Sequence, residues 1–505
     1  MAHLDALLPY VRAGTAEGDR SFLGQVFISP KQLDQLLGIE PGGMRLLVGN
    51  KGMGKSAIVE WLNSVCARRK LPCVLLRPDN LETQALSTAN DIGSLKKHFY
   101  ETLVASIASQ IGSQLKGLLT GHAATLHKAA QKAGLAERDA LQKSLALISA
   151  IAAPVANIDG VKLAKELTGT PSPNELIRAV QTQLLAGGTV FFVLIDDTDQ
   201  VASPSTPAHL NRIWALLLAV RRLVGECPSV RAIVTLRSEV WSRLISESEG
   251  QRDQADHLRG LLIMLRGTDK LIEDIIRRRL ERAAKDLRLP GDPYAIFFAG
   301  DRVMLPTSSV TRTWDTFLVK SSRERPRDSL QLIKNMIDCA KINGTDIMGS
   351  AEAEAAMKVY SKERVDDLYN EFAPDCPPIR QVIGSFSDID FEVNFETLRE
   401  HVSSIPSRFS LQLRGVLLKP QDDSDMIALL SLLHEAGFLN PRVPDARQPR
   451  EFRHILYQDD PNFTKPANWN GMQGAMWEVH PAFRSHLLAA KQDALSRSLR
   501  GRGAP

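Results

Sequence analysis

Residues 49–56 have the composition of a phosphate-binding loop. They read Gly-Asn-Lys-Gly-Met-Gly-Lys-Ser and fit the pattern G-x-x-x-x-G-K-[ST]. Glycines let the backbone wrap closely around phosphate oxygens, and successive N–H groups then point at the anion. Lys55 would reach the β- and γ-phosphates, and the Ser56 hydroxyl would hold Mg²⁺. The predicted nucleotide contacts are Gly49, Asn50, Lys51, Gly52, Met53, Gly54, Lys55, Ser56 and Ala57.

An acidic pair, Asp196 and Asp197, directly follows the apolar run Phe-Phe-Val-Leu-Ile at 191–195. A carboxylate at the carboxyl end of a parallel strand faces the ligand cleft of an α/β sheet. We therefore expect Asp196 to position Mg²⁺ and Asp197 to orient or activate the attacking water. The alternative is an Asp-Asp-Thr-Asp turn that caps the next helix, with Asp199 as the cap.

Two arginines complete the predicted catalytic set of Lys55, Asp196, Asp197, Arg237 and Arg327. Arg237 directly follows the apolar segment 231–236, beside the expected phosphate edge of the sheet. Arg327 begins an apolar helical pattern, where its side chain could fold back on the phosphates. An ordinary surface arginine is the alternative interpretation for each.

The elements that position these residues are indicated by apolar periodicity. Short apolar runs predict strands at 44–49, 72–76, 189–195 and 231–236, and helical spacing predicts helices at 56–68 and 211–223. Strands that alternate with helices predict an α/β fold with a parallel sheet covered on both faces.

Four segments follow from this pattern. We expect an N-terminal segment (1–40), a P-loop core (41–268) with a helical insertion at 81–168, a helical lid (269–372) and a winged-helix-like domain (373–505). Strands should cease after about residue 270 and return near the C-terminus. There, 451–460 and 474–483 look like paired strands around a long Pro/Asn/Gly-rich turn.

Composition narrows the class of protein. The chain has 505 residues, 44% hydrophobic and 24% charged, which is ordinary for a globular protein, and its net charge of +4 makes it no polycation. Five cysteines without a C-x-x-C pair indicate reduced thiols, with neither a disulfide framework nor a zinc site. The N-terminus lacks a secretory signal pattern, so a cytoplasmic location is expected. The apolar stretch 145–158 is too short to span a membrane, although membrane anchoring stays a minor alternative.

The motifs together resemble the AAA+/STAND branch of P-loop ATPases, and in particular a bacterial family associated with mobile elements or defence. The resemblance spans about 22–335 and is carried by SFLGQVFISPKQLDQLL, RLLVGNKGMGKSAI, FFVLIDDTD, AIVTLRSEVW and RPRDSLQLI. It implies that the cofactors are ATP and Mg²⁺, that Arg327 on the lid senses nucleotide, and that the protein forms a homo-oligomer with a protein partner or effector. Candidates for an arginine finger are Arg221, Arg222 and Arg259. Asp-Asp stands where many AAA+ motors have Asp-Glu, which makes a slow switch as plausible as a fast motor.

The C-terminal third offers a second partner. Arg453, His454, Lys465 and Arg484 could contact DNA phosphates, with Trp469 and Trp477 either in a recognition wing or packed in a small core. The preferred hypothesis is an ATP-hydrolysing, oligomerising switch in antiviral defence. The alternative is a DNA-binding AAA+ ATPase, initiator-like or transposition-loader-like, that uses the winged-helix-like domain. A binding module with an inactive ATPase site is a further possibility.

Overall fold

The computed structural model describes residues 2–12, 14, 17–81, 91–116, 119–136, 171–198, 208–247, 257–306, 310–323, 325–445 and 452–501. Contacts between residues divide the chain into two compact units. One unit comprises Thr15–Arg266, and we call it the sheet unit. The other combines Met1–Gly14 with Gly267–Pro505, and we call it the helical unit.

The sheet unit is built on a five-stranded parallel sheet with the order β2-β3-β4-β1-β5. Its strands are β1 (Met44–Gly49), β2 (Cys73–Leu76), β3 (Phe191–Ile195), β4 (Val230–Arg237) and β5 (Leu262–Met264). The four predicted strands are confirmed. The fifth was missed because a run of three residues carries almost no periodic signal.

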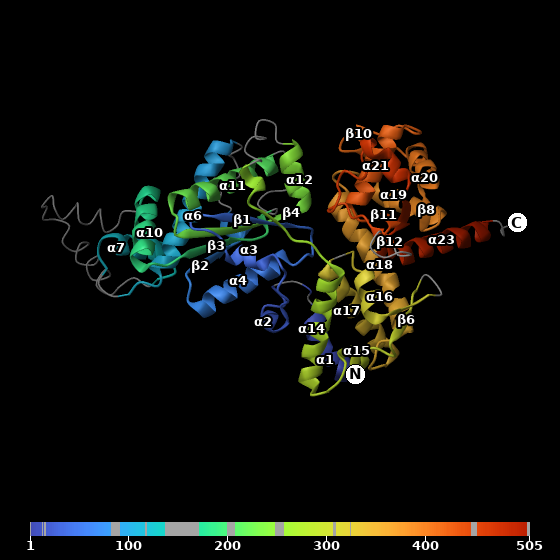
Figure 1. Ribbon diagram of the computed structural model, residues 1–505, viewed down its shortest axis with the longest axis horizontal. Coiled ribbons are helices and arrows are strands. Elements are labelled where there is room, and N and C mark those ends of the chain that lie inside the picture. The colour runs from blue at the N-terminus through green and yellow to red at the C-terminus, as the bar shows by residue number, and fades with distance from the viewer. Residues whose placement is uncertain are drawn as a thin grey trace, which may run out of the picture. The chain divides into compact units, whose positions relative to one another are not determined.

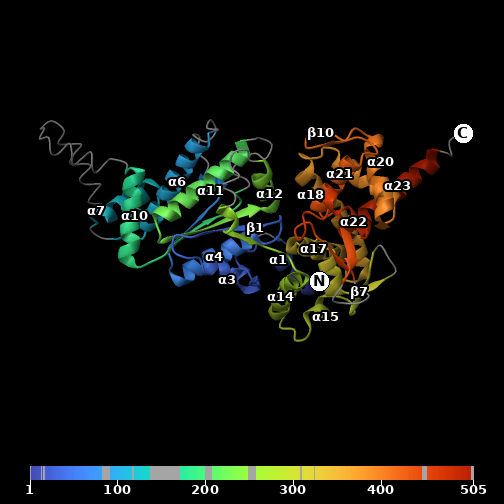
Figure 2. The ribbon, with the colours of Figure 1, turned by 45° about the horizontal axis from the view of Figure 1, so that its top comes forward.

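Helices cover both faces of this sheet (Figures 1 and 2). Residues of α3 and α4 share a buried apolar cluster with one face, and residues of α6, α10, α11 and α12 share the cluster on the other. The described helices of the unit are α2 (Leu23–Val26), α3 (Leu33–Leu37), α4 (Lys55–Arg69), α5 (Pro78–Leu81), α6 (Ile92–Gly112), α7 (Gly121–Lys132), α10 (Pro173–Gly187), α11 (Ala208–Glu226) and α12 (Ser238–Glu247). The predicted α/β P-loop core is thus confirmed.

The predicted insertion at 81–168 is helical where the structure describes it. Helices α6 and α7 lie within it and pack against each other and against α10. The apolar stretch 145–158 lies outside the described residues. Among the helices that the structure does describe, none is both long enough and apolar enough to cross a membrane.

The first part of the helical unit is the lid, residues 267–372. It contains α14 (Asp269–Leu287), α15 (Pro293–Phe297), β6 (Arg302–Met304), β7 (Thr311–Thr313), α16 (Trp314–Lys320), α17 (Pro326–Asn343) and α18 (Ser350–Phe372). The prediction that strands cease here is wrong, because β6 and β7 form an antiparallel pair. Their mostly exposed side chains leave no apolar run to detect.

The N-terminal helix α1 (Ala2–Val11) packs against α14 and α17 of the lid. The Arg279 guanidinium donates to the carbonyl of Tyr10, and Lys341 pairs with Asp5 at 2.5 Å. The predicted N-terminal segment 1–40 is therefore divided, since 1–14 belongs to the helical unit and 15–40 to the sheet unit. Contacts between distant residues decide this division, and a local sequence pattern does not contain them.

The rest of the helical unit, 373–501, has the topology of a winged helix. A helix, a strand, two helices separated by a short hairpin, and three strands follow in order, and the first strand, β8, pairs with the last, β13. The elements are α19 (Ile379–Ser385), η3 (Phe386–Asp388), β8 (Glu392–Asn394), α20 (Phe395–Arg408), β9 (Gln412–Leu413), β10 (Val416–Leu417), α21 (Asp423–Glu435), β11 (Leu439–Pro444), β12 (Phe452–His454), η4 (Pro466–Asn468), α22 (Trp469–Gln473), β13 (Met476–Val479) and α23 (Pro481–Gly501).

The predicted winged-helix-like domain is confirmed, but its strand pairing differs from the prediction. Strands β12 and β13 do not pair with each other, because β11 lies between them and pairs with both. The segment Leu439–Pro444 contains Asn440 and two prolines, which hide its strand character.

Candidate nucleotide site

The loop 50–54 joins β1 to α4 in the conformation expected of a phosphate cradle. Gly52 and Gly54 adopt φ values of 83° and 88°, in the left-handed region that L side chains rarely occupy. Gly49 needs the absence of a side chain for space, since a Cβ there would lie 3.2 Å from the carbonyl oxygen of Leu265. Helix α4 begins at Lys55, so its first-turn N–H groups and positive dipole end face the loop.

The Lys55 side chain folds back over this loop. Its ammonium Nζ donates to the carbonyl oxygens of Gly49 at 2.6 Å and Asn50 at 3.1 Å. The charge is thereby held above the cradle, where it can exchange these carbonyls for phosphate oxygens. The Ser56 side chain, one residue into α4, is partly accessible.

Sheet order brings the acidic pair to the same edge as the loop. Strand β4 lies between β1 and β3, and all three run parallel, so their carboxyl ends meet at one edge. Asp196 follows β3 directly and is 1% exposed. Its Oδ1 accepts from the Thr235 hydroxyl at 2.7 Å, whereas its buried Oδ2 has no hydrogen-bond partner within the described part of the chain. A buried, unpartnered carboxylate oxygen is costly unless a cation or water meets it.

Thr235, on β4, organises both acids. Its hydroxyl donates to Asp196, and its Oγ1 accepts from the backbone N–H of Asp197 at 3.2 Å. Asp197 has φ 53°, a conformation that aspartate tolerates better than most residues. The sequence pattern led to Arg237 on this strand and not to Thr235. The signal available in the sequence was a threonine inside the apolar run 232–236. The structure shows that it is fully buried and lies one register position beyond Ile195.

A Thr235→Val substitution is expected to lower ATP turnover about 10- to 100-fold and to raise the Mg²⁺ concentration needed for half-maximal turnover. Valine keeps the volume but leaves Asp196 without its hydrogen-bond donor. Turnover measured against Mg²⁺ concentration tests this, with Thr235→Ser as the control that keeps the hydroxyl. Unchanged Mg²⁺ dependence in the valine variant would show that Thr235 only packs.

The two predicted arginines lie in different units. Arg237 ends β4 in register with Gly49, is partly buried, and has an ion-pair contact of 3.9 Å with Glu239. Arg327 is exposed in the first turn of α17 in the helical unit, beside Gly14. Both catalytic roles stay predictions. Arg221, Arg222 and Arg259 likewise stay candidates only; Arg222 pairs with Glu226 at 2.8 Å on its own helix.

The arrangement fits a magnesium nucleotide. The donors are hard oxygens, a serine hydroxyl and a buried aspartate, which are what Mg²⁺ prefers. No group of three or more His, Cys, Asp or Glu side chains that could hold a metal ion occurs in the described ranges. Mg²⁺ would therefore be held by few protein groups together with the phosphates, as such sites commonly are.

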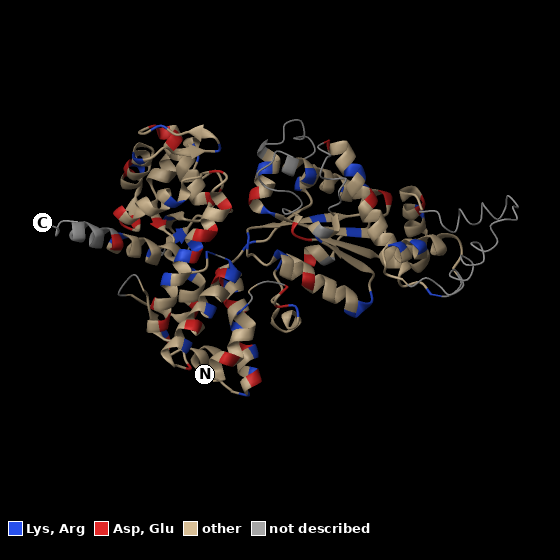
Figure 3. Ribbon diagram, turned by 180° about the vertical axis from the view of Figure 1, so that it is seen from behind, with Lys and Arg blue, Asp and Glu red and all other residues tan. Residues whose placement is uncertain are grey.

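The basic residues predicted to contact DNA separate into two kinds. Arg484 and His454 both contact Glu478, the histidine at 2.7 Å, so the Arg484 charge is locally compensated and the His454 ring is already engaged. Arg453 and Lys465 are exposed. Lys and Arg are interspersed with Asp and Glu along both units (Figure 3). Trp477 is fully buried and donates to the carbonyl of Met472 at 3.2 Å, so it is a core residue.

Helix α21 holds the place of the recognition helix in a winged helix, but it is covered. The chain between β12 and α22 folds over it. The Nε2 of His434 donates to the Ile455 carbonyl at 2.8 Å, and Thr464 donates to Ser431 at 3.3 Å. Burial lowers the pKa of His434 to about 4, which keeps the ring neutral. The N-cap and first turn of α21 are also acidic, with Asp422, Asp423 and Asp425.

Comparisons with known proteins agree with this organisation. Residues 270–369 match the family described as the FunZ-associated C-terminal helical domain, which coincides with the lid. The transposon gamma-delta 80.3 kDa protein of Escherichia coli (strain K12) is 22% identical over an alignment of 464 residues. The match covers 84% of this chain. The match covers 59% of that protein, so this chain spans less than two thirds of its length.

Several solved structures have a similar course of the chain. They include ORC2 of Aeropyrum pernix in ADPNP–ADP complexes (12% identity, 96% of this chain and 94% of that chain, TM-score 0.40). They also include Cdc6p from Pyrobaculum aerophilum (12% identity, 93% of this chain and 93% of that chain, TM-score 0.34). A further one is ORC1 of Aeropyrum pernix in complex with DNA (14% identity, 90% of this chain and 95% of that chain, TM-score 0.35). At these TM-scores the likeness is too remote to carry a functional argument. By themselves, the parallel sheet and the glycine-rich loop of this chain are those of a P-loop core.

Proposed function

We propose that this protein binds and hydrolyses ATP with Mg²⁺ and uses the nucleotide cycle to act on DNA. The observation that carries the ATPase part is the buried Asp196. It lies at the edge of the sheet where the P-loop begins and keeps one carboxylate oxygen unpartnered among the described residues. Such an oxygen next to a phosphate cradle is placed to hold Mg²⁺ or its water shell.

Each residue has a distinct part in the proposed reaction. The loop N–H groups and Lys55 hold the phosphates and offset the charge that develops on them. Ser56 and Asp196 hold Mg²⁺, which supplies charge neutralisation at the β- and γ-phosphates when bound. Asp197 orients the attacking water or accepts its proton, and Thr235 fixes the two acids relative to each other.

Two observations support DNA over the predicted assembly switch in defence. The helical unit ends in a winged-helix topology, a fold that many DNA-binding proteins use. The curated relative is described as a transposon protein. Because α21 is covered and begins with acidic residues, we place the DNA contact on the exposed wing residues Arg453 and Lys465 rather than on the helix.

The test measures ATP turnover together with the affinity for a short DNA duplex at about 50 and 200 mM salt, with no nucleotide, ADP or a non-hydrolysable ATP analogue. We expect turnover, and DNA affinity that depends on nucleotide and falls with salt. In Arg453→Ala/Lys465→Ala the slope of log affinity against log salt should decrease by about two, because two phosphate contacts are lost. Lys358→Ala, an exposed lysine of α18 in the lid, is the matched control and should leave the slope unchanged.

The outcomes separate the hypotheses. Turnover without DNA binding in any nucleotide state would contradict the DNA part alone. If light scattering shows that the ATP analogue raises the molecular mass of the protein without DNA, the result would favour the hypothesis of an oligomerising switch. Nucleotide binding without turnover would identify a binding module with an inactive site.

A further inference from the structure

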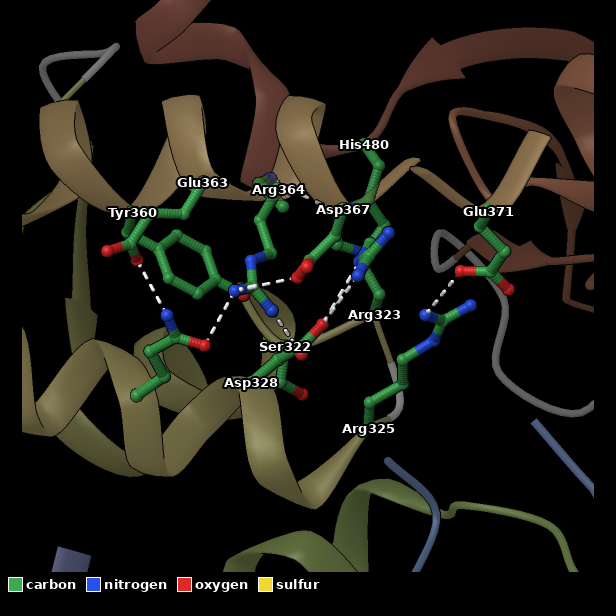
Figure 4. A network of polar contacts seen from close by, with 12 residues as sticks. Ser322, Arg323, Arg325, Asp328, Tyr360, Glu363, Arg364, Asp367, Glu371 and His480 are labelled. Atoms are coloured by element: carbon green, nitrogen blue, oxygen red, sulfur yellow. Dashed lines mark hydrogen bonds and ion pairs between the residues drawn. The ribbon is translucent and has the colours of Figure 1, made fainter. Parts of the chain in front are cut away.

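A network of buried charges surrounds the first turn of α17 (Figure 4). The Asp328 carboxylate, 4% exposed, accepts from Arg323 Nε at 3.0 Å on one oxygen and from Arg364 on the other. Arg325 pairs with Glu371 at 3.3 Å, and each of these side chains is 9% exposed. Burial works to raise the pKa of Asp328, but the charges of Arg323, Arg364 and Arg325 outweigh it and hold that pKa below its ordinary value.

Each of the three arginines in this network meets a carboxylate. Arg364 also pairs with Asp367 at 3.0 Å, so three arginines meet the three carboxylates of Asp328, Glu371 and Asp367. The Tyr360 hydroxyl donates to the Ser321 carbonyl at 2.6 Å and extends the network to the end of α16. A buried ion pair adds little net stability, but loss of one partner strands a buried charge, so few other arrangements are tolerated.

The same network reaches into the winged-helix domain. The Arg323 guanidinium lies over the ring of Phe483, with 5.4 Å between its central carbon and the ring centroid. Phe483 is fully buried in the first turn of α23. This helix begins directly after His480, which is also buried. One helical turn further on, the His486 backbone N–H donates to the Ser361 hydroxyl of α18 at 2.9 Å. Helix α23 is thus fixed to the lid by packing, by a hydrogen bond and by a cation held in a buried ion pair.

One arginine of this segment is not part of the network. Arg327 lies between the buried Pro326 and Asp328 but points to solvent. The arginine that the sequence predicts to sense nucleotide therefore projects from a turn whose neighbouring residues are tied to α18 and to α23.

We propose that this network makes the lid and the winged-helix domain a single rigid lever, which carries a nucleotide-driven movement of the lid unchanged to the domain that meets DNA. This inference rests on the proposed function, since it assigns the route by which the nucleotide site regulates the winged helix. Without the buried charges, α23 would keep its packing against α18 and the single hydrogen bond from His486 to Ser361, and the two parts could move separately.

The test compares the wild-type full-length chain with Arg323→Gln, and uses Lys358→Gln on the exposed face of α18 as the matched control. Hydrogen exchange of α18 and α23 is measured with ADP and with a non-hydrolysable ATP analogue, together with ATP turnover and affinity for a short duplex. In the wild type we expect the two helices to change protection together, and duplex affinity to differ about fivefold or more between the nucleotides. In Arg323→Gln we expect turnover within about threefold of wild type, a nucleotide response confined to the lid, and an affinity ratio near one.

Several results would overturn the lever. One is a nucleotide response of α23 in Arg323→Gln equal to that of the wild type, and another is a wild-type lid that responds without α23. Should Arg323→Gln not fold, Phe483→Leu is tested in its place, because it keeps an apolar side chain and removes the ring beneath the guanidinium, a ring that also packs against Phe438 and His480. Absence of ATP binding or turnover in the wild type would instead contradict the proposed function, and it is read from the activity assay alone.

Discussion

Replacing Lys55 with alanine should lower ATP affinity about 10- to 100-fold and turnover about 100- to 1,000-fold. The Lys55 ammonium lies over the loop, 2.6 Å from the Gly49 carbonyl, and alanine removes this charge while α4 keeps its N-terminus. The affinity loss corresponds to one charge-assisted hydrogen bond, about 1.5–3 kcal/mol. The larger loss of turnover follows because negative charge on the phosphates is redistributed in the transition state. Nucleotide titration by calorimetry and phosphate release measure the two quantities.

The same loop offers the matched control. Lys51 lies four residues before Lys55 at a variable position of the motif, so its backbone and not its side chain is expected to serve the phosphates. Lys51→Ala should therefore keep affinity and turnover within about threefold of wild type. Wild-type turnover in Lys55→Ala would overturn the assignment of the P-loop as the nucleotide site.

The Asp197→Asn variant should turn over ATP about 100-fold more slowly while binding it within about threefold of wild type. Asparagine has the same shape and tolerates the left-handed conformation, φ 53°, that Asp197 adopts. Its N–H bond to Thr235 Oγ1 is a backbone contact and remains. The substitution thus removes a carboxylate base and keeps this backbone contact. Single-turnover phosphate release and equilibrium nucleotide binding give the comparison.

The Asp196→Asn variant is compared with Asp197→Asn. It removes the charge that would face Mg²⁺, so it should weaken binding of the magnesium nucleotide as well as turnover. Equal losses of affinity and turnover in Asp197→Asn would mean that Asp197 shapes the turn after β3 and does no chemistry.

Local sequence was sufficient for the parts of the site that are local in the chain. The turn around Gly52 and Gly54, the strand before it and the helix after it depend on neighbouring residues, whose types alone favour one conformation. The same holds for Asp196, which ends an uninterrupted apolar run. Strands β1, β3 and β4 are largely buried on both faces, and this gives them a strong apolar signal.

Only the tertiary structure decided how distant residues are paired. Thr235 meets Asp196 because β4 is inserted next to β3, and 39 residues separate the two in sequence. Strand β11 lies between β12 and β13 because of sheet order, although a simple hairpin would satisfy the sequence pattern equally well. In the segment that begins with Arg323, the residue types do not tell which arginines are buried. Arg323 and Arg325 are buried because each forms an ion pair inside the fold, with Asp328 and Glu371 respectively. Arg327, in the same segment, is exposed to solvent.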